Sequence, residues 1–169
     1  YLKYNQKNTL SNLFKITYYQ PEEKMILDYP TRKNLEIFES NNISKKNTAL
    51  LGVIDYTKTA MGSRKLKSWL SQPLTDLNKI NNRLGNTKAY LTEFDISSEL
   101  RNIFEEIYDL ERILAKVTFE TANARDLIAL KNSLKVIPLI KENLSMTNIR
   151  ELKNTGEKID SLEDLFDLL

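Results

Sequence analysis

Four carboxylates between positions 105 and 111 are the residues whose types and spacing come closest to a catalytic arrangement. Glu105 and Asp109 are four residues apart, so a helix would place them on one face. A glycosidase pair or a di-metal site instead needs two acids that face each other across a cleft. We therefore interpret Glu105, Glu106, Asp109 and Glu111 as a solvated acidic face, and keep a hydrolase built on the first three as an alternative.

Missing residue types narrow the chemistry further. The chain has no histidine and no cysteine, which excludes Ser-His-Asp and Cys-His catalysis and nearly all zinc sites within these residues. Its four glycines, at positions 52, 62, 85 and 156, cannot form either of the common glycine-rich phosphate loops. We expect no catalytic, metal or cofactor site in these residues, and hence no enzyme activity from them alone.

A basic run is the second candidate site, and it lies in a stretch without acids between Asp55 and Asp76. Basic side chains can contact phosphates without special geometry, but this run lacks the interleaved aromatic residues of single-strand binding surfaces. The net charge of +2 is too balanced to indicate nucleic-acid binding by itself. We predict a solvated or interdomain face, with DNA contact as the alternative, for Lys58, Arg64, Lys65 and Lys67.

The basic run belongs to the stretch around which the chain is organised. Two short helices are expected there, joined at a corner over residues 55–59, with Asp55, Thr57 or Thr59 capping the second helix. Trp69, the only tryptophan, falls on the same side as neighbouring apolar residues at helical spacing. We therefore place Trp69 in the core, packed on the corner, and regard Asp55 and Trp69 as structural anchors.

Hydrophobic spacing predicts an all-α, irregular multi-helix domain of about seven or eight helices. Residues 17–29 read as extended chain with one possible short strand, and residues 40–47 read as a polar surface loop. The cleanest apolar stripe runs over residues 100–117, with a break near Tyr108 and Asp109. Arg112 is a third anchor, because it can pair with Asp109 three residues earlier on a helix.

Capping residues and prolines predict where the helices begin and end. One apolar side is formed by Leu77, Ile80, Leu84, Leu91 and Phe94. We expect a helix over 1–16, a second helix opened by Pro30-Thr31 with Thr31 as its cap, and a third from Asp76 to about Phe94. Further helices should start at Ser97 or Ser98 and at Asn123, and Pro138 should interrupt the latter. Gly156 is expected as a C′ residue, and residues 159–169 as a last amphipathic helix.

The length of 169 residues corresponds to about one domain. No apolar run approaches the roughly 18 residues needed to span a bilayer, and no basic-then-apolar leader opens the chain. The absence of cysteine fits a reducing cytoplasm. Because the chain begins with Tyr1 rather than methionine, we expect it to be a piece of a longer protein.

Short segments distributed along the chain occur in one fixed order. They are YLKYNQK (1–7), MILD (25–28), TRKNLE (31–36), LLGVID (50–55), TAMG (59–62), Trp69-Leu70 with Pro73-Leu74, Ile80, Arg83-Leu84, YDLERI (108–113) and ANARDL (122–127). Together they resemble the MutS family of bacterial DNA mismatch repair proteins. The chain departs from the usual family pattern at Lys33, Gly85 and Asn86, where Arg, Asp and Ala are common.

This resemblance implies both a place in the family's architecture and a role. Residues 1–24 correspond to the end of the connector domain and a linker, and residues 25–169 to the first part of the helical lever, or core, domain. The family is a homodimeric ATPase of the bacterial cytoplasm that binds mismatched double-stranded DNA and recruits MutL. Its clamp and its ATPase domain, which uses ATP and Mg, are absent here, so the resemblance implies a non-catalytic segment that couples the nucleotide site to DNA clamping.

Overall fold

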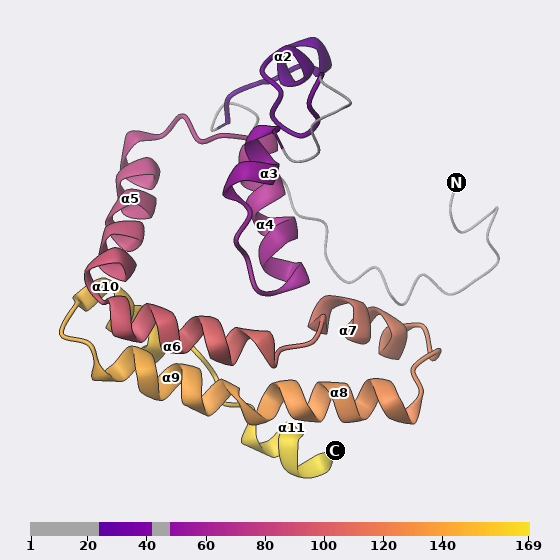
Figure 1. The fold of residues 1–169 in the computed structure, drawn as a ribbon. Coiled ribbons are helices and arrows are strands. Elements are labelled where there is room, and N and C mark those ends of the chain that lie inside the picture. Colours follow the sequence, from indigo (N-terminus) through magenta and orange to yellow (C-terminus); the bar gives the residue numbers. More distant parts are fainter. Residues whose placement is uncertain (1–23, 42–47) are drawn as a thin grey trace.

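The computed structural model describes residues 24–41 and 48–169 (Figure 1). The helix predicted over 1–16, the first part of the possible strand over 17–29 and most of the loop over 40–47 lie outside the described residues.

The described residues are mainly helical and form no strand, which confirms the all-α prediction. They form α2 (Tyr29–Asn34), α3 (Leu50–Ile54), α4 (Ala60–Ser71), α5 (Leu77–Thr92), α6 (Phe94–Glu105), α7 (Leu110–Thr118), α8 (Ala124–Lys135), α9 (Ile137–Met146), α10 (Arg150–Glu157) and α11 (Glu163–Leu168). Seven of these have eight residues or more, in line with the expected seven or eight, and α2, α3 and α11 are single-turn helices of five or six residues. The possible strand is reduced, in the described part, to one isolated antiparallel bridge between Lys24 and Leu74.

Several helix boundaries follow the predicted local signals. The Thr59 side chain accepts from the Gly62 N–H at 3.0 Å, which caps α4, and Asp76 caps α5 through the Lys79 N–H at 3.0 Å. Asn123 opens α8 with a full capping box. Pro138 stands in the first turn of α9, so it separates α8 from α9 as expected for a residue without an N–H.

Three predicted boundaries are wrong. The cap of α2 is Asp28, whose carboxylate accepts from the Thr31 N–H, rather than the Thr31 side chain. Helix α6 begins at Phe94 without a side-chain cap, and the Ser97 hydroxyl, expected to start it, instead donates to the Tyr90 carbonyl. Gly156 lies inside α10 rather than after its end.

Two rows of helices make up most of the molecule (Figure 1). Helices α6 and α7 follow one another in the upper row, and α9 and α8 lie beneath them in the lower row. Contacts pair α6 with α9 and α7 with α8, while α10 packs on α9 and α5 and α11 packs on α8. Helices α4 and α5 stand on the other side of the upper row, joined by the link over 72–76.

Buried apolar side chains concentrate between α5 and α11, a region that we call the body. One cluster contains Ala89, Leu100, Ile103, Val136, Ile140, Leu144 and Leu152, and a second contains Ile113, Leu130 and Leu134. By contrast, α2, α3 and α4 contain no buried residue. We call the described part of residues 24–72 the arm. Its buried apolar residues are Ile37 and Ala49, outside these helices, so the arm has little hydrophobic core of its own.

Candidate functional site at the joint between arm and body

The corner between α3 and α4 is organised by Asp55. One carboxylate oxygen of Asp55 accepts from the Thr57 N–H at 3.1 Å and the Thr57 hydroxyl at 2.6 Å, and the other accepts from the Ser63 hydroxyl at 2.6 Å. These donors, led by Ser63, hold the pKa of Asp55 below its usual range. The carboxylate therefore ties the corner to the first turn of α4.

Two cations of the basic run lie beside this corner and pair with acids of the body. Lys58 forms an ion pair with Glu105 at the end of α6. Arg64 lies opposite Asp109 and Glu111, at the start of α7, and its two terminal nitrogens donate to the two carboxylate oxygens of Asp109 at 2.8 and 2.7 Å. The Arg64 Nε and one terminal nitrogen also donate to Glu111 at 2.9 and 2.6 Å. A planar guanidinium that engages both oxygens of a carboxylate is the strongest geometry for such a pair.

The electrostatics of the joint follow from these contacts. Hydrogen bonds from Arg64 lower the pKa of Asp109. The hydrogen bond to Asp109 makes the largest contribution to the raised pKa of Arg64, and the hydrogen bond to Glu111 the next largest. The hydrogen bond and charge of Lys58 lower the pKa of Glu105. Because the pKa values of both carboxyls are lowered and that of Arg64 is raised, the paired, fully ionised state is the stable one at neutral pH.

The acidic residues were predicted as a solvated face and the basic run as a solvated or interdomain face. In the structure Glu105, Asp109 and Glu111 of the first pair with Lys58 and Arg64 of the second, so the two form one joint. Their partners are 45 to 47 residues apart in sequence, so no local spacing rule connects them. The signal that could have found the joint is charge complementarity between an acid-free basic stretch and a dense acidic one. Of the four residues of the basic run, Lys65 and Lys67 form no ion pair with the described residues. The Lys67 ammonium lies 5.7 Å from the ring centre of Phe38.

Arg112 occupies a different position from the one predicted. Its backbone N–H, rather than its guanidinium, donates to Asp109 at 3.2 Å and so caps α7. The ion-pair partner of Asp109 is Arg64, which reaches it from α4. The positive charge of Arg112 still contributes to the lowered pKa of Asp109.

The prediction that Trp69 is a core residue packed on the corner is wrong. Its side chain is 40% exposed, and the Arg83 guanidinium of α5 lies over the indole at 3.9 Å from the ring centre. Ten residues of helix separate Thr59 from Trp69, or roughly 15 Å, which places the indole at the opposite end of α4. Trp69 is thus a second attachment of the arm, through a cation–π contact.

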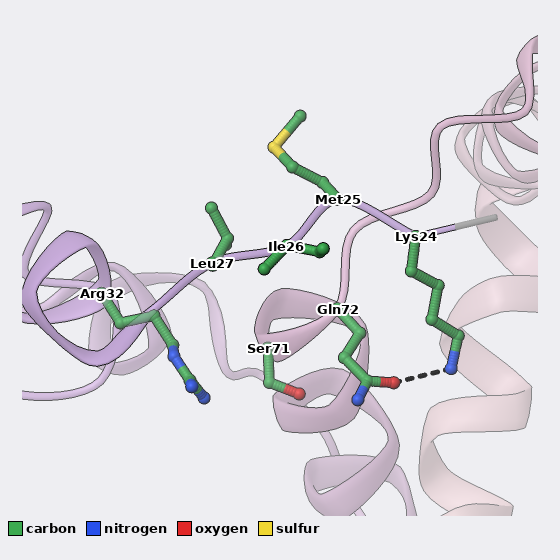
Figure 2. A pocket seen from close by; sticks show the side chains of 7 residues that line it. All are labelled: Lys24, Met25, Ile26, Leu27, Arg32, Ser71 and Gln72. Carbon is green, nitrogen blue, oxygen red and sulfur yellow. Dashed lines mark hydrogen bonds between the residues drawn. The ribbon is translucent and has the colours of Figure 1, made fainter. Parts of the chain in front are cut away.

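A cavity of about 320 Å³ lies at the C-terminal end of α4, away from the ion pairs of the joint (Figure 2). Its lining residues are Lys24, Met25, Ile26, Leu27, Arg32, Ser71 and Gln72. The Lys24 ammonium donates to the Gln72 side-chain carbonyl at 2.6 Å, and the Met25 N–H donates to the Pro73 carbonyl at 2.8 Å. The lining contains no carboxylate or histidine. The cavity lies where the start of the arm contacts the end of α4.

Catalysis by the acidic residues gains no support from this geometry. Glu105 and Asp109 are each engaged by a cation. Glu105 and Glu106 are neighbours in the lining of a pocket of about 270 Å³, but Asp109 does not line it. No group of three potential metal ligands occurs among residues 24–41 and 48–169. In the same residues, no helix combines the length and the hydropathy needed to cross a lipid bilayer.

Acidification is expected to loosen the arm from the body, and the single tryptophan can report it. Glu105 and Asp109 have lowered pKa values in the folded chain, so their stabilising effect is present above their ordinary pKa values and disappears as pH falls through the lowered ones. Acrylamide quenching of Trp69 should therefore increase between pH 7 and pH 3 before helix content, followed by circular dichroism, declines.

The Arg64→Ala variant should show the increased quenching already at pH 7, and Lys65→Ala, its neighbour, should behave like the unmodified chain. Equal quenching of the unmodified chain and Arg64→Ala over the whole pH range would contradict this role of the ion pairs.

Comparison with known proteins gives a consistent match over the entire chain. Residues 30–168 match the family model described as MutS domain III. The chain is 44% identical over its whole length to the DNA mismatch repair protein MutS of Halothermothrix orenii, 42% to that of Pelotomaculum thermopropionicum and 41% to that of Clostridium kluyveri. It spans about a fifth of the length of these relatives, 19 to 20%.

Proposed function

This chain belongs to the MutS family, and from that premise we propose that it is a non-catalytic lever segment of a longer DNA mismatch repair protein. In this proposal residues 1–24 are the end of a connector domain with its linker, and residues 25–169 are the first part of the lever. The family-model match, which begins at residue 30, is compatible with a boundary at this point.

The observation that carries the proposal is the contrast between the arm and the body. The body is held by two clusters of buried apolar side chains, whereas the arm is attached through ion pairs at the α6–α7 corner and a cation–π contact on α5. Exposed ion pairs are individually weak and exchange readily with water. The arm can therefore rotate as a unit against a stiff body, which is the movement that a coupling element requires.

Nucleotide and metal belong elsewhere in the proposed protein. The family resemblance implies ATP and Mg, but the residues described here do not fit them. Gly52, Gly62, Gly85 and Gly156 all lie within helices, so none is free to form a phosphate-cradling loop. We assign the nucleotide site to another part of the longer polypeptide, and likewise propose mismatched double-stranded DNA, MutL and a second subunit as partners of that full-length protein in the bacterial cytoplasm.

A freestanding helical DNA-binding domain is the alternative, and it has less support. Lys58 and Arg64 are engaged by acids that also place negative charge beside them. A phosphate would have to compete with Asp109 and Glu111 for the Arg64 guanidinium. Such a domain would also lose affinity for every duplex when Lys65 is replaced, a loss that the lever proposal does not require.

The test is a charge exchange at the joint in the full-length protein that carries these residues. Arg64→Asp should slow the ATP-triggered release from mismatched duplex, because it sets like charges against Asp109 and Glu111, while DNA-independent ATP hydrolysis stays unchanged. Adding Asp109→Arg should restore part of the coupling, since one attractive pair is re-formed. Stopped-flow fluorescence with a labelled duplex measures the release, and Lys65→Ala is the matched control.

Three outcomes would overturn the proposal. The first is release at the unmodified rate in Arg64→Asp, which would make the joint irrelevant to coupling. The second is an equal loss of ATP hydrolysis, which would point to general damage. The third is a loss of duplex affinity in Lys65→Ala as large as in Arg64→Asp, which would favour the DNA-binding alternative.

A further inference from the structure

Helix α5 carries a row of leucines that no residue of the described chain covers. Leu77, Leu84 and Leu91 are 68, 61 and 77% exposed. They are seven residues apart, so they align along one side of a 16-residue helix. Phe94, the first residue of α6, follows just after the end of α5 and is also largely exposed. We call Leu77, Leu84 and Leu91 the leucine stripe. Exposed leucines that share one side of an otherwise polar helix are typical of an interaction surface.

The leucine stripe faces away from both the arm and the core of the body. Arg83 points to Trp69 of the arm, and successive residues of a helix are about 100° apart, so Leu84 projects roughly a quarter turn away from α4. Ala89, which is buried in the first cluster, marks a further side of α5. Neither α4 of the arm nor the buried cluster of the body therefore covers the leucine stripe.

We propose that the leucine stripe is the docking seam for an acidic amphipathic helix, supplied by a part of the same longer polypeptide outside residues 1–169. The inference rests on the proposed function, because it requires that longer protein. A seven-residue apolar spacing fits a partner helix packed nearly parallel or antiparallel. The 16 residues of α5 include Lys79, Arg83 and Lys88 and no acid. Lys88 lies next to the stripe, four residues after Leu84 and three before Leu91, so acids on the partner helix would complement it.

Charge argues against the other occupants of the stripe. In a second copy of the chain, two α5 helices with three basic residues each and no acid would repel one another. The first 16 residues of the chain have leucines at positions 2, 10 and 13, but they contain three lysines and no acid, so they offer no complementary charge. The relatives, in contrast, have about four-fifths of their length outside the matched region, which leaves ample sequence for a docking helix.

Thiol labelling tests the proposal directly, since the chain has no native cysteine. Leu84→Cys reports the stripe, and Asn86→Cys, on roughly the opposite side of the same helix, is the matched control. In the 169-residue chain both thiols should react with a maleimide at similar rates. In the full-length protein, with any cysteine outside these residues replaced, Leu84→Cys should react on the order of ten-fold more slowly because the docked helix must open first, and Asn86→Cys should keep its rate.

A second substitution tests the charge of the partner. Lys88→Glu in the full-length protein should return the Leu84→Cys labelling rate towards that of the 169-residue chain, whereas Lys88→Arg should not. Equal rates for Leu84→Cys in the two proteins would overturn the proposal, as would protection that survives Lys88→Glu. Protection in the 169-residue chain that grows with concentration would assign the stripe to a second copy instead. These readouts do not involve ATP or DNA, so they separate a failure here from a failure of the coupling proposal.

Discussion

Replacing Leu152 with alanine is expected to lower the free energy of unfolding of the 169-residue chain by about 2–5 kcal/mol. The Leu152 side chain is fully buried. It belongs to the buried cluster that also contains Leu144 of α9 and Leu100 and Ile103 of α6. Alanine removes three carbon atoms and leaves a cavity that the surrounding helices can fill only by shifting against one another. The loss therefore includes both the transfer free energy and the cost of the cavity.

Urea denaturation followed by circular dichroism at 222 nm measures this effect, and the dependence on urea concentration should stay unchanged if the folded state is otherwise preserved. Leu139→Ala is the matched control, because Leu139 lies on α9 with its side chain about half exposed. Leu139→Ala should lower the free energy of unfolding much less than Leu152→Ala does. Similar losses in the two variants would show that α10 does not pack on α9 as the structure describes.

The sequence predicts those parts of the fold that depend on neighbouring residues. Thr59, Asp76 and Asn123 begin helices because a side-chain oxygen close in sequence accepts from the first free N–H groups. Pro138 divides α8 from α9 because the proline itself lacks the donor. Such features need no knowledge of what lies opposite, and for this reason the helical class could be predicted from the residues alone.

What the sequence did not predict depends on which segments meet. Trp69 has helical spacing with apolar neighbours, yet its indole is covered by Arg83 of the next helix rather than by a core. Arg64 and Asp109 are 45 residues apart, and their pairing exists only because the corner before α4 reaches the start of α7. The apolar side predicted for the helix after Asp76 is real, but Leu77, Leu84 and Leu91 are exposed within the described residues. Periodicity identifies an apolar face without identifying the element that covers it.

The same substitution at two helical glycines is expected to have opposite effects on stability. Gly85 lies inside α5, and a Cβ added there would have no atom within 4 Å. Gly85→Ala should therefore raise the free energy of unfolding by about 0.5–1 kcal/mol, the gain in helix propensity. At Gly156, inside α10, an added Cβ would lie 2.9 Å from the Leu144 Cβ and 3.5 Å from the Lys141 carbonyl oxygen.

That contact involves atoms fixed to the two backbones, so relief requires α10 to move away from α9 and opens the cluster around Leu144. Overpacking of this kind costs about 1–3 kcal/mol, which exceeds the gain of roughly 1 kcal/mol from helix propensity. Gly156→Ala should thus melt at a lower temperature than the unmodified chain, and Gly85→Ala at a higher one, in the same calorimetric buffer. If both variants were stabilised, intrinsic helix propensity would govern α10, and the close approach of α9 and α10 would be wrong. The opposite signs would show that Gly156 is required by the packing of two helices, a constraint that its position in the sequence does not reveal.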